Sequence, residues 1–90
     1  MQVHIEFYGI PRQRTGTAAV TLEFPDDTVS LLSIVDDLTS RFSELAASCF
    51  AGNSLQHGYA ANLNGEQFLM GDEMIPDRAT VLLLSADAGG

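Results

Sequence analysis

The sequence contains no lysine and no tryptophan, and it has a single cysteine. Its four basic residues are all arginines (Arg12, Arg14, Arg41 and Arg78), against twelve acidic residues, so the formal net charge is −8 at pH 7. Without lysine, no side-chain ammonium can form a Schiff base or accept an acyl group. The acidic balance disfavours binding to nucleic acid and to anionic membranes, and it favours a partner with a basic face.

The single cysteine, Cys49, excludes an internal disulfide and the ligand sets of two or four cysteines that hold zinc or iron–sulfur clusters. No apolar run reaches the roughly 18 residues of a membrane span. Residues 1–6 also lack the basic and apolar segments of a signal peptide. We therefore expect a cytoplasmic protein that binds neither nucleic acid nor membrane.

Two alternating apolar runs near the N-terminus predict a pair of strands. Apolar and polar residues alternate over residues 3–8, with the period of two that is typical of a half-buried strand. Gly9, Pro11 and Gly16 interrupt the pattern, which returns over residues 20–24. Because the two runs are so close in the sequence, they predict a β-hairpin with an intervening loop.

From Ser30 the apolar residues recur at steps of three and four, which predicts one amphipathic helix that stops at Gly52-Asn53. Thr28 or Ser30 is the expected N-cap. Cys49 continues the apolar stripe, so we interpret it as a buried, unreactive thiol. The stripe consists of Leu31, Ile34 or Val35, Leu38, Phe42, Leu45 and Cys49.

The second half of the chain predicts three more strands. Residues 59–63 and 67–69 flank Asn64-Gly65, a pair that favours a tight hairpin turn, while residues 71–78 are rich in turn formers. Residues 80–85 are almost continuously apolar, as in a strand at the middle of a sheet. The order of elements predicts a small α+β domain with one main helix across a mixed sheet. The first and last strands would then be parallel neighbours.

Two glycines, Gly89 and Gly90, end the sequence. Glycine has no Cβ, so such an end is thin enough to enter a narrow slot and exposes the carboxylate of Gly90 as the reactive group. Terminal glycines also occur simply because chain ends fray, or as remnants of cloning. The ending alone leaves these alternatives open.

The predicted strand order together with Gly89-Gly90 resembles the prokaryotic ubiquitin-like sulfur carriers, namely the small subunit of molybdopterin synthase and the thiamine-pathway sulfur carrier. Residues 7–16 are similar to the first strand and following loop of the molybdopterin subunit, residues 28–32 to the start of its helix, and residues 63–66 to its hairpin. The resemblance covers nearly the whole chain. It implies a single β-grasp domain over residues 1–90, with a sheet of four to five strands and a flexible tail at residues 86–90.

The tail departs from the molybdopterin subunits. Residues 84–88 lack the aromatic residue and prolines that commonly precede the diglycine, and residues 76–80 replace the usual Asp-Gly-Asp turn. The length and the long helix nevertheless resemble the molybdopterin subunit more than the shorter thiamine carriers.

The resemblance implies a reaction at Gly90, with Gly89 giving the tail access to a partner's site. An E1-like adenylyltransferase would use ATP and magnesium to convert the Gly90 carboxylate to an acyl-adenylate. A persulfide sulfur would then displace AMP and leave a thiocarboxylate. The chain would be a cosubstrate and no enzyme on its own, and it would bind no cofactor or metal itself.

The expected acceptor pathway is molybdopterin, and hence molybdenum cofactor, biosynthesis, with the large subunit of molybdopterin synthase as a partner. Leu84 and Phe68 are the predicted docking residues, although both also fit core positions. Two alternatives stay open: a carrier for thiamine or another sulfur-containing metabolite, and a ubiquitin-like interaction module or modifier.

Other polar residues favour structural roles. His4 and His57 lack metal-ligand spacing, so they are expected at the surface or in hydrogen bonds. The acidic pairs at residues 26–27 and 36–37 are expected to be solvated, with Asp37 and Arg41 forming an i, i+4 pair.

Overall fold

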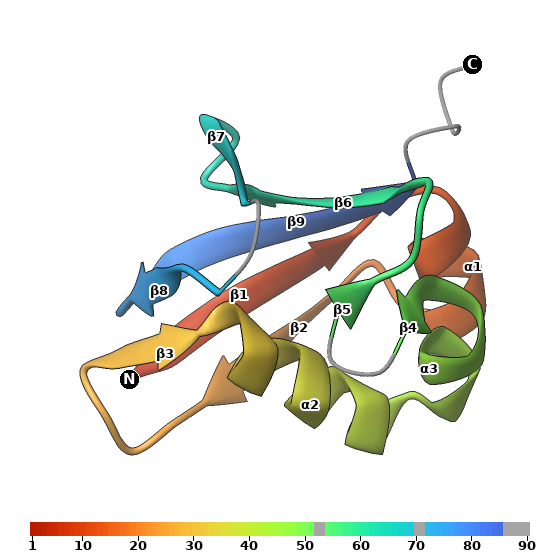
Figure 1. Ribbon diagram of the computed structural model, residues 1–90. Helices are drawn as coiled ribbons and strands as arrows, with labels where there is room; N and C mark the ends of the chain where they lie inside the picture. The colour runs from red at the N-terminus through yellow and green to blue at the C-terminus, as the bar shows by residue number, and fades with distance from the viewer. Residues whose placement is uncertain (52–53, 70–71, 86–90) are drawn as a thin grey trace.

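A five-stranded mixed sheet organises the molecule (Figure 1). In the computed structural model, which describes residues 1–51, 54–69 and 72–85, the strands lie in the order β2-β1-β9-β6-β7. β1 (Gln2–Phe7) and β9 (Ala79–Ser85) are parallel neighbours at the centre. β2 (Ala19–Glu23), β6 (Tyr59–Leu63) and β7 (Gln67–Leu69) each run antiparallel to the strand they join. The predicted α+β class and the parallel pairing of the first and last strands are confirmed.

The core lies between one face of this sheet and α2 (Leu31–Arg41), which crosses it (Figure 1). Side chains alternate along a strand, so every second residue of β1 and β9 points to the same face. On that face both strands present apolar residues, all buried: Val3, Ile5, Phe7, Ala79, Val81 and Leu83. The helix packs against this face with its predicted apolar stripe, which is also buried and consists of Leu31, Ile34, Val35 and Leu38.

The predicted long helix is two helices. α2 begins after Ser30, whose hydroxyl oxygen accepts a hydrogen bond from the Ser33 backbone N–H at 3.1 Å, so Ser30 rather than Thr28 is the N-cap. At Phe42 the backbone turns to φ −129° and ψ 89°, outside the helical range, and α3 (Ser43–Cys49) follows. The Phe42 ring packs edge-to-face on Phe7, with centroids 5.6 Å apart. Sequence spacing could not reveal this break because apolar residues continue across it.

Five short elements, one helix and two pairs of strands, differ from the sequence prediction. The loop expected between β1 and β2 contains α1 (Ile10–Thr15), with a proline in its first turn and Gly16 at φ 73° after its last residue. β3 (Thr28–Ser30) pairs with β8 (Met74–Pro76) inside the segment expected to be turns. β4 (Phe50–Ala51) and β5 (Ser54–Leu55) form a third pair.

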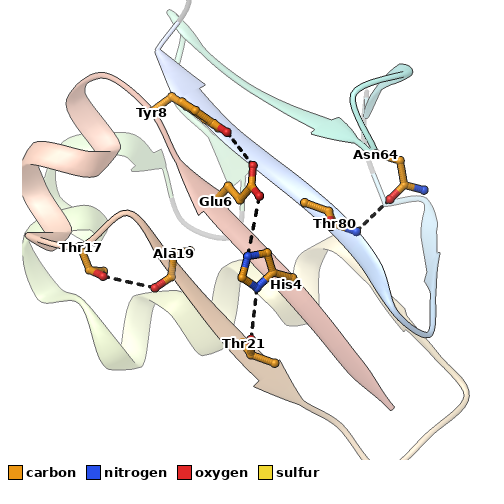
Figure 2. A network of polar contacts seen from close by, with 8 residues as sticks. All are labelled: His4, Glu6, Tyr8, Thr17, Ala19, Thr21, Asn64 and Thr80. Atoms are coloured by element: carbon orange, nitrogen blue, oxygen red, sulfur yellow. Dashed lines mark hydrogen bonds and ion pairs between the residues drawn. The ribbon is translucent and has the colours of Figure 1, made fainter.

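The predicted hairpin turn is confirmed. Asn64 and Gly65 have φ 58° and 75°, the left-handed values that a tight hairpin requires. The Asn64 side-chain oxygen accepts a hydrogen bond from the Thr80 backbone N–H at 2.8 Å, which ties the turn to β9 (Figure 2). The predicted helix stop at Gly52-Asn53 is wrong, because α3 ends at Cys49 and the extended residues Phe50–Ala51 pair with β5. The predicted tail at residues 86–90 lies outside the described residues. Within the described ranges, no helix is long and apolar enough to cross a membrane.

Replacing Ser30 with alanine should lower the free energy of unfolding by about 1 kcal/mol, because the Ser33 N–H loses its side-chain acceptor. Urea unfolding at neutral pH measures the change. Ser40→Ala, at an exposed position on the same helix, is the matched control and should change stability by less than half as much. Equal effects of the two substitutions would contradict the capping role.

Candidate functional site

The end of β9 is fixed from two sides. Ser85 is only 3% exposed, and its hydroxyl accepts a hydrogen bond from the Ile10 backbone N–H at 3.3 Å, at the start of α1. On the other side the register places Ser85 opposite Tyr59 of β6. Both β6 and α1 therefore determine the position of the end of β9 (Figure 1). Gly89 and Gly90 themselves lie outside the described residues, so their reactive role stays a prediction.

Two of the four arginines lie close to this end. Arg12 and Arg14 are exposed on α1, which packs against β9. In a chain of net charge −8, they place positive charge near the last described residue, Ser85. The sequence pattern does not distinguish them, because it predicts a loop for this segment and does not place that loop beside the last strand.

The sheet face opposite α2 forms a second part of the site, which we call the open face. The strand register assigns its side chains, because residues directly opposite each other point to the same side. One half, on β1, is polar, and the other half, on β9, β6 and β7, is mostly apolar. The open face includes His4, Glu6, Tyr8, Ala60, Asn62, Phe68, Thr80, Leu82 and Leu84, and Ala19 and Thr21 of β2 border its polar half.

A row of polar contacts runs along β1 and on to β2 (Figure 2). The Tyr8 hydroxyl donates to Glu6 Oε1 at 2.6 Å, and the other carboxylate oxygen of Glu6 lies 3.7 Å from His4 Nε2. His4 Nδ1 lies 3.2 Å from Thr21 Oγ1 on β2. The hydrogen bond to Glu6 raises the pKa of the Tyr8 phenol above its ordinary value. His4 is thus in a hydrogen-bonded surface position, as expected from the sequence.

Phe68 and Leu84, the two predicted docking residues, are both on the open face. Phe68 is 58% exposed on the edge strand β7, so the alternative that it belongs to the core is wrong. Leu84 is half-buried near the end of β9, with Ala60 opposite it on β6. Their part in docking stays a prediction, but the fold presents both residues on the open face of the sheet, and Leu84 is adjacent to Ser85, the last described residue.

Cys49 is fully buried at the end of α3, as its place on the apolar stripe predicted. Burial raises the pKa of its thiol, while a hydrogen bond with Tyr59 and the charge of Arg14 act in the opposite direction. A thiol held in its neutral form is a poor nucleophile. Within the described residues, no group of three or more His, Cys, Asp or Glu side chains could hold a metal ion.

Solved structures of known proteins share this architecture, whereas no family model and no curated protein matches the sequence. SAMP1 from Haloferax volcanii matches over 100% of both chains, with 15% identity and a TM-score of 0.85. A putative molybdopterin converting factor, subunit 1, from Pyrococcus furiosus matches over 93% of this chain and 95% of its own, with 15% identity and a TM-score of 0.74.

A chain in the BexX/CysO complex of Amycolatopsis orientalis matches over 98% of this chain and 99% of its own, with 26% identity and a TM-score of 0.72. This chain has the ubiquitin-like β-grasp fold. The resemblance to ubiquitin-like sulfur carriers that the sequence suggested is confirmed by these neighbours.

Tyr8, Ser85 and Asn62 are site residues that the sequence analysis missed. Alternation along β1 could have placed Tyr8 on the same face as His4 and Glu6. Nothing in the sequence pairs Ser85 with Ile10, which is 75 residues away. Only the strand register shows which residues of different strands meet.

Cys49→Ala should lower the free energy of unfolding at pH 7 by about 1 kcal/mol, because a small cavity replaces the sulfur. The raised thiol pKa means that the folded state holds a proton that the unfolded state loses at alkaline pH. Wild-type stability should therefore fall as pH rises above the ordinary thiol pKa, and the advantage over Cys49→Ala should shrink. Urea unfolding of the wild type and of Cys49→Ala at pH 7 and pH 10 measures these stabilities. If the stability difference in favour of the wild type grows with pH, the raised pKa of the buried Cys49 thiol is contradicted.

Proposed function

We propose that this protein is a sulfur carrier whose Gly90 carboxylate is activated by an E1-like adenylyltransferase. The observation that carries the proposal is a β-grasp domain whose last strand ends at an anchored Ser85, five residues before Gly90. The general carrier role is supported by neighbours that are sulfur carriers or ubiquitin-like modifiers. The finer chemistry rests on the Gly89-Gly90 sequence.

The reaction requires that the Gly90 carboxylate reach the active site of the partner enzyme. Residues 86–90 would reach about 17 Å when fully extended, at about 3.3 to 3.6 Å per residue. The partner's active site would therefore lie within that distance of Ser85, while the globular body docks outside. Because glycine has no side chain, Gly89 and Gly90 can enter a slot that fits bare backbone.

In the reaction, a Gly90 carboxylate oxygen attacks the α-phosphate of ATP and pyrophosphate leaves. The outer sulfur of a persulfide donor then displaces AMP, and a thiol cleaves the resulting sulfur–sulfur bond to release the thiocarboxylate. ATP and magnesium are held by the adenylating partner. The carrier supplies the carboxylate, the tail and a docking surface.

The sulfur acceptor that we favour is a molybdopterin precursor, with the large subunit of molybdopterin synthase as the second partner. Support comes from the similarity of residues 7–16 and 63–66 to the molybdopterin subunit and from the likeness to a putative molybdopterin converting factor. Leu84 and Phe68 would contact the partner, since a few apolar anchors dominate most interfaces.

A second candidate function is that of a protein modifier. Neighbours from Haloferax volcanii and Methanosarcina acetivorans are named small archaeal modifier proteins. In that case the activated Gly90 would form an amide with a lysine of another protein. Tryptic peptides that carry residues 79–90 of this chain on a lysine, found by mass spectrometry in cells expressing it, would distinguish this function from sulfur transfer, because Arg78 is the last basic residue before Gly90.

Adding one residue after Gly90 should abolish ATP-dependent adenylation, because the reacting carboxylate is then no longer that of the diglycine. ATP–pyrophosphate exchange with the purified E1-like enzyme measures the loss. As a control, carboxypeptidase removal of the added residue should restore exchange. Normal activation of the extended protein would overturn the proposed role of Gly90.

Gly89→Leu should reduce sulfur transfer sharply, by at least about tenfold, because its side chain would clash in a slot shaped for backbone. Ala88→Leu adds a similar side chain one residue earlier and should cost less. The assay supplies each variant as the only carrier to cells that lack either the molybdopterin or the thiamine carrier.

Rescue of thiamine synthesis alone by the wild type would contradict the molybdopterin assignment.

A further inference from the structure

Asn62, in the middle of the open face, has a buried polar atom without a hydrogen-bond partner. The residue is only 8% exposed, and its Oδ1 is the one buried side-chain nitrogen or oxygen in the described part of the chain that lacks a partner. An unpaired buried acceptor destabilises a protein, and nearly all such atoms are paired in folded proteins. An apolar residue at this position would serve the fold of the free protein better.

The surroundings of Asn62 combine an aromatic ring with apolar contacts. The strand register places Asn62 directly opposite Phe68 on β7 and directly opposite Leu82 on β9. Side chains paired in this way have Cβ atoms about 4.5 to 5.5 Å apart. Phe68 is 58% exposed, whereas Asn62 Oδ1 is buried beside it, so a group that packs on the ring reaches this oxygen once the amide turns outward.

A carboxylate completes the row. Glu6 is on β1, which lies on the other side of β9 from β6, and it pairs directly with Leu82. Its two carboxylate oxygens face Tyr8 and His4. An exposed ring, an unpaired amide oxygen and a carboxylate thus follow one another across the sheet from β7 to β1. We call these four residues the recognition row: Phe68, Asn62, Leu82 and Glu6.

An arginine side chain matches this set of groups. The guanidinium stacks on aromatic faces, its five N–H groups are all donors, and its charge is attracted by a carboxylate. The chain itself has a net charge of −8, which further favours a cationic partner surface. A purely apolar partner would leave the amide oxygen of Asn62 without a hydrogen bond, so the destabilisation present in the free protein would remain in the complex. An arginine would remove it by donating to this oxygen.

We propose that the recognition row binds an arginine side chain of the protein that docks on the open face. The Asn62 amide turns outward, and the guanidinium stacks on Phe68 and donates a hydrogen bond to Asn62 Oδ1. The charge of Glu6 attracts the guanidinium from two strand spacings away, about 10 Å from Asn62. The proposal rests on the proposed function only in taking the E1-like adenylyltransferase as that protein.

The test measures the Kd between this protein and the purified E1-like adenylyltransferase of the same organism by calorimetry. Asn62→Leu should weaken binding by about tenfold, since a charged donor loses its acceptor. The same variant should raise the thermal midpoint of the free protein, because it removes the unpaired oxygen. Gln67→Leu makes a comparable polar-to-apolar change at an exposed position of β7, on the other face of the sheet. As the matched control, it should leave the Kd unchanged.

A second variant, Glu6→Gln, keeps the shape of the side chain but removes its charge. It should weaken binding and make the Kd less dependent on salt. Phenylglyoxal, which blocks arginine, should abolish binding when applied to the adenylyltransferase, and the bound carrier should protect against it. Acetylation of the enzyme's lysines should have no such effect.

The outcomes separate this proposal from the proposed function. If the wild type binds but is not adenylated, the proposed function fails, and the Kd values still decide on the recognition row. If Asn62→Leu binds as tightly as the wild type, the arginine proposal is overturned while adenylation stands. If lysine acetylation abolishes binding and phenylglyoxal does not, or if the wild type does not bind at all, the proposal is overturned.

Discussion

The parallel pairing of β1 with β9 is the constraint on which the rest of the structure depends. Its register runs from Val3 opposite Ala79 to Phe7 opposite Leu83, and the ladder continues where the Tyr8 N–H donates to the Leu83 carbonyl at 2.9 Å. Parallel neighbours need a crossover connection, and α2 supplies it by packing on one face of the sheet. The opposite face is left open, and the end of β9 lies beside α1.

The two halves of the candidate site follow from this pairing. Because β1 and β9 end at the same edge of the sheet, Ser85 meets Ile10, the first residue of α1. Both arginines of α1 are without an ion pair among the described residues. Because alternate residues face opposite sides, the strands that bury Ile5 and Val81 also place Glu6 and Leu82 on the open face. The absence of lysine suits such a donor, since the chain offers no side-chain amine to an activated glycine.

Much of this fold could be predicted from the sequence, since residue spacing alone indicates strands β1 and β9 and helix α2. The hydrogen-bonded turn at Asn64-Gly65 also follows from local chemistry, because those residue types tolerate positive φ. The break at Phe42 and the β3–β8 pair could not be predicted in the same way. Both depend on partners distant in the sequence, Phe7 for the break and residues 74–76 for β3.

The same distinction between local sequence and distant partners applies to the candidate site. Gly89 and Gly90 are conspicuous in the sequence, and their chemistry was inferred from a resemblance. Phe68 could be placed on a strand but not on a face. Asn62 looked like an ordinary strand residue, because only the register shows that its neighbours are Leu82 and Phe68 and that its amide oxygen lacks a donor.

The central claim is that Gly90 carries sulfur, and the intact mass of the protein isolated from its native cells tests it most directly. The sulfur-carrier account predicts a fraction heavier by the difference between one sulfur and one oxygen atom, with the change located in the C-terminal peptide. A preparation in which every molecule ends in an ordinary carboxylate, even from cells that are actively making sulfur-containing cofactors, would contradict it.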